Sequence, residues 1–125
     1  MEYLLIGLGG FLGANARYLV SGWIAHRWGV VFPWGTFVAN ISGSFLLGML
    51  MGILQHHPTV SPNYRLFFAV GFLGAYTTFS TFSYETVRLA QDQGTRLAVL
   101  NIVGSASLGL IGVLLGFVFA RVVSE

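Results

Sequence analysis

Residues 63–90 read NYRLFFAVGFLGAYTTFSTFSYETVRLA, and this stretch decides what kind of fold the chain can form. It is long enough to span a membrane, since about 20 apolar residues cross a hydrocarbon core roughly 30 Å thick. Its middle is unusual, because Gly71 and Gly74 precede six hydroxyl-bearing residues in a window of eight. Such residues weaken a helix, so the stretch predicts a transmembrane helix with a local break. Broken helices at membrane depth occur where they line a site, and exposed backbone carbonyls there could hold a cation.

Three further apolar segments flank this stretch, at about residues 3–25, 33–54 and 96–123. Each has 20 or more residues and can cross a bilayer at a rise of about 1.5 Å per residue. Short polar turns separate the four segments, which together consume the chain. The sequence therefore predicts an all-α integral membrane protein, with residues 1–125 forming a single domain of four transmembrane helices, the third of them broken.

Composition excludes several other classes of protein. Of 125 residues, 55% are hydrophobic and 8% are charged, and the mean hydropathy is +0.77. A soluble domain carries roughly 25% charged residues, so this chain lacks the surface that water requires. The six cations are all arginines and form no basic patch, which argues against a nucleic-acid partner. No nucleophile–base pair and no metal-ligand cluster emerges, so we do not expect an enzyme.

The arginines give little orientation signal. Cytoplasmic loops normally carry the excess of cations. One side of the predicted bundle would hold two arginines and the other three, with Arg17 inside the first span. Two interpretations remain open: the chain inserts both ways and pairs with itself in an antiparallel dimer, or a weak bias still fixes one orientation.

Polar residues recur at helical spacing inside two spans. Thr36, Asn40 and Ser44 are four residues apart on the second span, and Asn101 and Ser105 are four apart on the fourth. Polar side chains are costly in a membrane and often mark a pathway. The alternative is that these side chains hydrogen-bond to neighbouring helices and so hold the bundle together. Small residues at helical spacing, such as Gly9 and Gly13, have a packing role of their own, because they let helix backbones approach closely.

Two phenylalanines within the hydroxyl-rich window share a helix face, because Phe79 and Phe82 are three residues apart. An aromatic ring carries a positive edge. Ring edges, together with Asn and Ser donors, could therefore coordinate a small anion without a formal charge. Ordinary packing or lipid contact is the alternative for an isolated pair of rings.

Three motifs together resemble the CrcB/Fluc family of fluoride channels over essentially the full chain. They are Gly9-Gly-Phe-Leu-Gly-Ala-Asn-Ala-Arg-Tyr18, Gly35-Thr-Phe-Val-Ala-Asn-Ile-Ser-Gly43 and Gly74-Ala-Tyr-Thr-Thr-Phe-Ser-Thr-Phe-Ser-Tyr-Glu85. The resemblance implies an antiparallel, dual-topology homodimer with two narrow fluoride pathways. It also implies a multi-pass protein of a prokaryotic plasma (inner) membrane, in contact with membrane lipid.

The resemblance further implies roles for individual residues. Phe79 and Phe82 would be pathway phenylalanines, Asn40 a pathway amide, and Arg17 would attract anions near an aqueous vestibule. A structural sodium ion at the dimer centre would be held by the backbone carbonyls of Gly74 and Thr77. The remaining candidates for the fluoride pathway are Thr36, Ser83, Asn101 and Ser105. Asn101 and Gly109 depart from the family pattern, which leaves the ligands of the fourth helix open.

The function implied is passive, fluoride-selective conduction that exports fluoride from the cytoplasm and relieves its toxicity. A small multidrug-type proton-coupled exporter is the main alternative, since it too has four short helices in antiparallel pairs. Such an exporter needs a membrane-embedded carboxylate in its first helix, where this chain has only Glu2 at the extreme end. A structural subunit that organises other membrane proteins is a third possibility.

Overall fold

The computed structural model describes residues 1–125 and contains helices only. Helix α1 (Glu2–Trp28) and helix α2 (Trp34–His56) form the first two spans, and α6 (Thr95–Ser124) forms the fourth. The third span, Pro62–Gln93, consists of α3 (Pro62–Tyr64), the π-helix η1 (Arg65–Leu73), α4 (Gly74–Tyr76) and α5 (Phe79–Gln93). All four spans are long and apolar enough to cross a membrane, which confirms the all-helical, four-span prediction.

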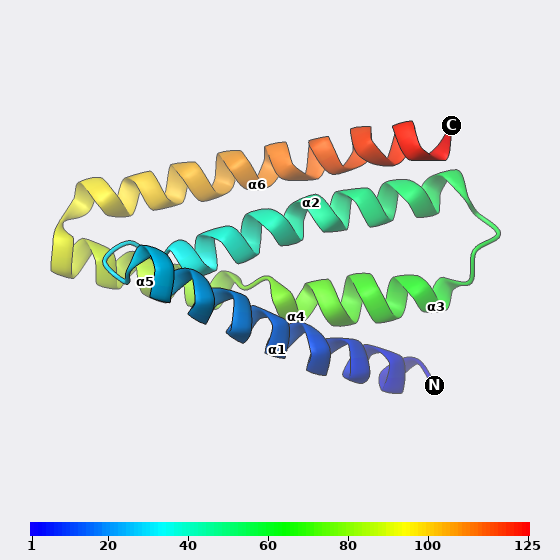
Figure 1. Cartoon of the computed structure of the whole chain (residues 1–125), viewed down its shortest axis with the longest axis horizontal. Coiled ribbons are helices and arrows are strands. Elements are labelled where there is room, and N and C mark those ends of the chain that lie inside the picture. The colour runs from blue at the N-terminus through cyan, green and yellow to red at the C-terminus, as the bar shows by residue number, and fades with distance from the viewer.

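The spans run up and down, so both chain ends lie at the same end of the bundle as the α2–α3 connection (Figure 1). The α1–α2 and α5–α6 connections lie at the opposite end. Both of these turns contain a glycine with a positive φ angle, 91° at Gly29 and 99° at Gly94. Glycine adopts this conformation without the steric cost of a Cβ, which allows the chain to reverse within a few residues.

Close packing between spans depends on glycines. A Cβ on Gly48 or Gly116 would overlap backbone atoms across the α2–α6 contact. A Cβ on Gly9 or Gly13 would likewise overlap the backbone of η1. Small residues let helix backbones approach closely in a bilayer, where dispersion contacts drive association. The glycines of the sequence therefore have a packing role, as their spacing predicts.

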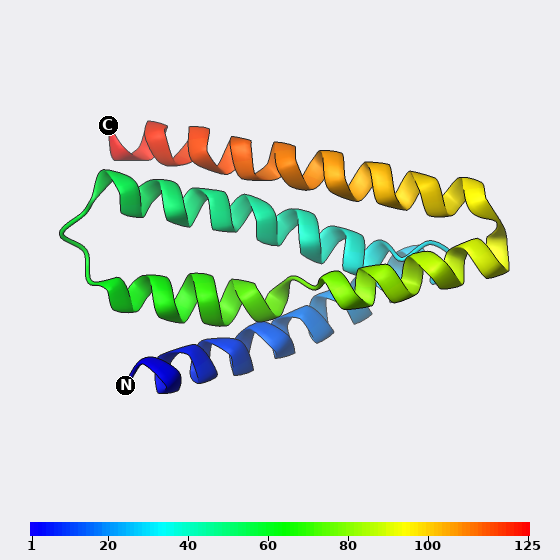
Figure 2. The same cartoon turned by 180° about the vertical axis from the view of Figure 1, so that it is seen from behind.

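The interruption of the third span lies at Thr77 and Thr78, between α4 and α5 (Figure 2). Both residues are extended, with φ and ψ of −92° and 153° at Thr77 and −150° and 126° at Thr78. The hydroxyl of Thr78 then caps α5 by accepting a hydrogen bond from the backbone N–H of Thr81. The expected break is thus present within the hydroxyl-rich window.

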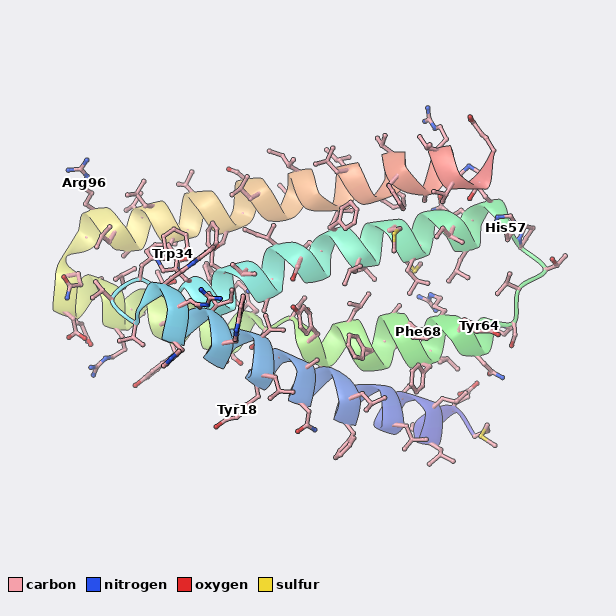
Figure 3. The ribbon with its side chains drawn as sticks, in the orientation of Figure 1. Tyr18, Trp34, His57, Tyr64, Phe68 and Arg96 are labelled. Carbon is pink, nitrogen blue, oxygen red and sulfur yellow. The ribbon has the colours of Figure 1, made fainter.

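Most side chains point outward. Only 19 of 125 residues are buried, and the exposed ones include large apolar residues along every span. Figure 3 shows side chains projecting from all sides of the bundle rather than into one core. A surface of this kind suits hydrocarbon and would be unstable in water.

Candidate functional site

The amide of Asn40 on α2 holds the broken segment. Its Oδ1 accepts a hydrogen bond of 2.9 Å from the backbone N–H of Thr78, and its Nδ2 donates one of 3.1 Å to the carbonyl of Thr78. A polar backbone group without a partner costs several kcal/mol in a membrane, so the two bonds stabilise the extended conformation. One side chain therefore satisfies both polar groups of one residue at the break.

These bonds leave two carbonyl groups without their usual helical donors. In an α-helix the carbonyl of Gly74 would accept from the N–H of Thr78, but that N–H is donated to Asn40. The carbonyl of Thr77 would accept from the N–H of Thr81, but that N–H is donated to the Thr78 hydroxyl. Carbonyl oxygens are hard ligands suited to hard cations. The two free carbonyl oxygens at the break, those of Gly74 and Thr77, are therefore suitable ligands for a small cation.

The neighbouring carbonyl, that of Ala75, is occupied differently. Arg17 on α1 donates a hydrogen bond of 3.1 Å from Nε to this carbonyl, across 58 residues of chain. Arg17 is half-buried. The break is thus held by one side chain from α1 and another from α2.

A groove of about 760 Å³ runs along the break between α2, the third span and α6. The rings of Phe79 and Phe82 are 5.8 Å apart and tilted by 45°, and Phe79 is 79% exposed. No residue that lines the groove is charged. The groove brings together seven of the ten candidate site residues: Asn40, Gly74, Thr77, Phe79, Phe82, Ser83 and Ser105. Ser44 of the second-span stripe and Gly109 of the fourth span also line it.

Two candidates from the fourth and second spans lie outside this groove. Asn101 is almost fully buried, where it donates a hydrogen bond of 2.9 Å to Thr86 and accepts one of 3.2 Å from Ser105. Thr36 is buried and lines a different hollow. The groove therefore receives the hydroxyl of Ser105 but not the amide of Asn101, and the role of Asn101 and Thr36 in a pathway stays a prediction.

The second hollow, of about 920 Å³, lies toward the end of the bundle that carries the α1–α2 and α5–α6 connections. It is lined by Arg17 and Thr36 together with charged residues of α5. Arg88 pairs with Asp92 at 3.2 Å, whereas the buried Oε1 atom of Glu85 has no hydrogen-bond partner. The wall of this hollow is therefore charged, unlike the wall of the groove.

Sequence reasoning missed two polar contacts near the break. Tyr76 is buried and its hydroxyl lies 3.0 Å from that of Ser42 on α2. Thr86 accepts from Asn101 and itself donates to the carbonyl of Phe82. The sequence gives only a general indication of such contacts. A break in a membrane helix leaves backbone groups without partners, and polar residues on neighbouring helices must then supply them.

Taken together, these features define a class: multi-pass helical membrane proteins in which a broken span faces a groove of neutral polar groups and phenyl rings. The particular family follows from comparison with known proteins. Residues 4–117 match the family model described as "CrcB-like protein, Camphor Resistance (CrcB)". The chain belongs to this family.

Curated relatives match along almost their whole length. A protein of Acidobacterium capsulatum named "Fluoride-specific ion channel FluC" is 51% identical over 118 residues, covering 94% of each chain. A protein of Solibacter usitatus with the same name is 45% identical, covering 97% of this chain and 99% of its own. An archaeal relative from Methanosarcina acetivorans, "Fluoride-specific ion channel FluC 1", is 44% identical, covering 94% and 88%.

Proposed function

We propose that this protein is a fluoride-specific ion channel that conducts fluoride passively and exports it from the cytoplasm of a prokaryote across the plasma (inner) membrane. The observation that carries the proposal is the uncharged groove in which Phe79 and Phe82 lie beside Ser83 and Ser105. Full-length relatives that are named as fluoride-specific channels support it.

The chemistry of the groove favours a small anion. Fluoride is strongly hydrated, so a narrow path that strips its water must compensate the lost hydration free energy with hydrogen-bond donors that point at the ion. The hydroxyls of Ser83 and Ser105 donate to the carbonyl of Phe79 and the amide oxygen of Asn101, so each would turn its proton toward a passing ion. The positive edges of phenyl rings attract an anion without binding it too strongly to leave. A larger halide gains less from each donor because its charge is spread over a larger radius.

We further propose that two copies of the chain pair as an antiparallel, dual-topology homodimer. The groove is open along one side, since Phe79 on its wall is 79% exposed. A second copy laid over this face would enclose the groove and exclude lipid. Near-equal numbers of arginines at the two ends of the bundle permit both orientations.

A structural sodium ion fits the break in such a dimer. The carbonyls of Gly74 and Thr77 would hold it, because the N–H groups that a continuous helix would supply to them are donated elsewhere. The ion would fix the position of the break by supplying positive charge to these oxygens. The residues of the chain itself, Asn40 and Arg17, meanwhile hold the neighbouring carbonyls.

Fluoride efflux from liposomes tests the channel directly. Purified protein is reconstituted into vesicles loaded with potassium fluoride, and valinomycin is added to release the charge while an electrode follows fluoride. We expect rapid loss of fluoride, no loss of chloride from vesicles loaded with potassium chloride, and little fluoride loss with Phe82→Ile. Phe11→Ile, at an exposed ring on α1, is the matched control and should conduct normally.

The alternatives make different predictions in the same assay. A proton-coupled exporter would move its substrate only with a pH gradient and would not leak fluoride. A structural subunit would give no flux at all, and Phe82→Ile would change only packing. Absence of efflux from a correctly folded protein would therefore reject the channel proposal.

A further inference from the structure

An apolar groove on the outer face of the α2–α6 contact has no part in the proposed pathway. It has a volume of about 700 Å³, and ten of its twelve lining residues are hydrophobic. On α2 it is lined by Ile41 and Phe45, which lie about 100° around the helix from Asn40 and Ser44 of the polar groove. The apolar groove thus opens on a different side of the α2–α6 pair from the surface that a second copy would cover.

One end of the apolar groove is closed by aromatic rings at the α1–α2 connection. Trp28 and Trp34 meet edge to face with ring centres 5.4 Å apart, and Phe37 lies 5.6 Å from Trp34 in the same geometry. Tryptophan collects at the boundary between hydrocarbon and headgroups, because its ring is apolar and its N–H is polar. This end of the groove therefore lies at headgroup level.

The groove has the length of one lipid leaflet. From Trp34 to Leu46 the axis of α2 advances about 18 Å at 1.5 Å per residue, and one leaflet of a hydrocarbon core is roughly 15 Å thick. The polar group along this wall, the hydroxyl of Ser42, donates to the carbonyl of Ala39 and lies 3.0 Å from the Tyr76 hydroxyl. The lining of the groove therefore suits a hydrocarbon chain.

Two unpaired arginines lie at the aromatic end. Arg27 is exposed, precedes Trp28 and stands over the ring of Trp23, with the guanidinium carbon 5.2 Å from the ring centre. Arg96 is exposed on the first turn of α6, and Figure 3 shows it at the same end of the bundle as Trp34. The ion pair of the chain involves Arg88, so neither Arg27 nor Arg96 is neutralised by an acid.

We propose that the apolar groove binds one acyl chain of an anionic membrane phospholipid, whose headgroup is held by Arg27 and Arg96. Cations at the membrane surface attract anionic headgroups, and long arginine side chains reach outward to meet them. The site depends on the membrane placement of α2 and α6 and goes beyond fluoride conduction. In an antiparallel pair, each leaflet would contain one such site.

Quenching of tryptophan fluorescence by brominated lipid tests the proposal. The variant Trp23→Phe leaves Trp28 and Trp34 as the fluorophores, both at the groove. It is reconstituted in phosphatidylcholine with increasing amounts of chain-brominated phosphatidylglycerol or chain-brominated phosphatidylcholine. We expect half-maximal quenching at a roughly 25-fold lower mole fraction of the phosphatidylglycerol, since each of the two arginines near an anionic headgroup contributes a factor of about five.

Matched variants separate the acyl groove from the headgroup site. Leu108→Phe narrows the groove and should abolish the preference, whereas Leu110→Phe, at a 69% exposed residue that does not line it, should retain it. The double variant Arg27→Gln with Arg96→Gln should make the two lipids quench alike. Arg121→Gln, at the other end of the bundle, should retain the preference.

Three results would overturn the proposal. Equal quenching by both lipids would show that the site does not select an anionic headgroup. An unchanged preference for phosphatidylglycerol in Leu108→Phe would show that the apolar groove does not hold the acyl chain. Failure of both lipids to quench, with a disulfide between copies through Leu46→Cys, would mean that a second copy covers this face. Fluoride efflux from the same vesicles is read separately, so failure of the channel proposal would leave the lipid result interpretable.

Discussion

Single residues from α1 and α2 complete the hydrogen bonding that the break in the third span interrupts. Asn40 satisfies both backbone groups of Thr78, and Arg17 donates to Ala75. Asn40 faces the polar groove as well, so it both holds the break and contributes to the wall of the proposed pathway. A substitution of Asn40 would therefore remove the hydrogen bonds that hold the break and any contact with an ion at the same time.

Replacing Asn40 with alanine should therefore disrupt the break as well as the pathway. Two part-buried backbone groups within the membrane span would lose their partners, at a cost of roughly several kcal/mol each, so we expect lower thermal stability in detergent and loss of fluoride efflux. Asn15→Ala is the control, because Asn15 is exposed and donates only to Phe11 of its own helix. Normal stability of Asn40→Ala would show that the break does not depend on this amide.

Arg17 combines a hydrogen bond with a charge, and two substitutions separate these effects. Lysine keeps the charge but loses the planar guanidinium, whereas glutamine loses the charge. If the charge draws fluoride into the hollow, Arg17→Gln should lower the efflux rate roughly tenfold at low ionic strength and less at high salt. Arg17→Lys should retain most of the rate. Equal losses in both variants would instead assign Arg17 to holding Ala75.

At the scale of elements, hydropathy and length predict the four spans, and the glycine and hydroxyl content of residues 71–84 predicts the break. The π-helical conformation of η1 has no such signal. The polar stripes were only partly informative, because successive i, i+4 residues rotate by about 40° around a helix. Thr36 is therefore turned away from Ser44 and into the other hollow. The helices that pack against the break are determined by tertiary packing. The spacing of residues within one segment does not predict which helix lies beside it.

The contact between α1 and η1 gives a sharp test of glycine packing. A Cβ on Gly13 would lie 2.9 Å from Cα of Phe72 and closer still to its carbonyl group, so Gly13→Ala must push the helices apart. Overpacking of this kind costs roughly 1–3 kcal/mol. Gly22→Ala on the same helix meets nothing within 4 Å and should be neutral or slightly stabilising. Unfolding temperatures in detergent compare the two, and equal values would contradict the packing role.

At the scale of the whole molecule, the arrangement of the spans sets the distribution of charge between the two sides of the membrane. Arg65 begins η1 and Arg121 lies in the last turn of α6, at the end of the bundle that holds both chain ends. Arg27 lies in the last turn of α1, Arg88 on α5 and Arg96 in the first turn of α6, toward the opposite end. Figure 1 shows where these elements begin and end. Orientation follows the excess of cations on the cytoplasmic side, and two against three is nearly balanced. Both orientations are expected in one cell, which an antiparallel dimer requires.

Shifting this balance should break and then restore function. Thr59→Lys, Val60→Lys and Arg96→Gln together put four cations at the end with the chain termini against two at the other, so this variant should keep its termini in the cytoplasm. Arg65→Gln with Arg121→Gln should do the reverse. Cytoplasmic and periplasmic reporters fused to the C-terminus would report each orientation. If the channel is an antiparallel dimer, neither variant alone should protect cells from fluoride, because each supplies one orientation only. Expressed together they should restore protection, whereas full protection by either one alone would mean that parallel copies or single chains conduct.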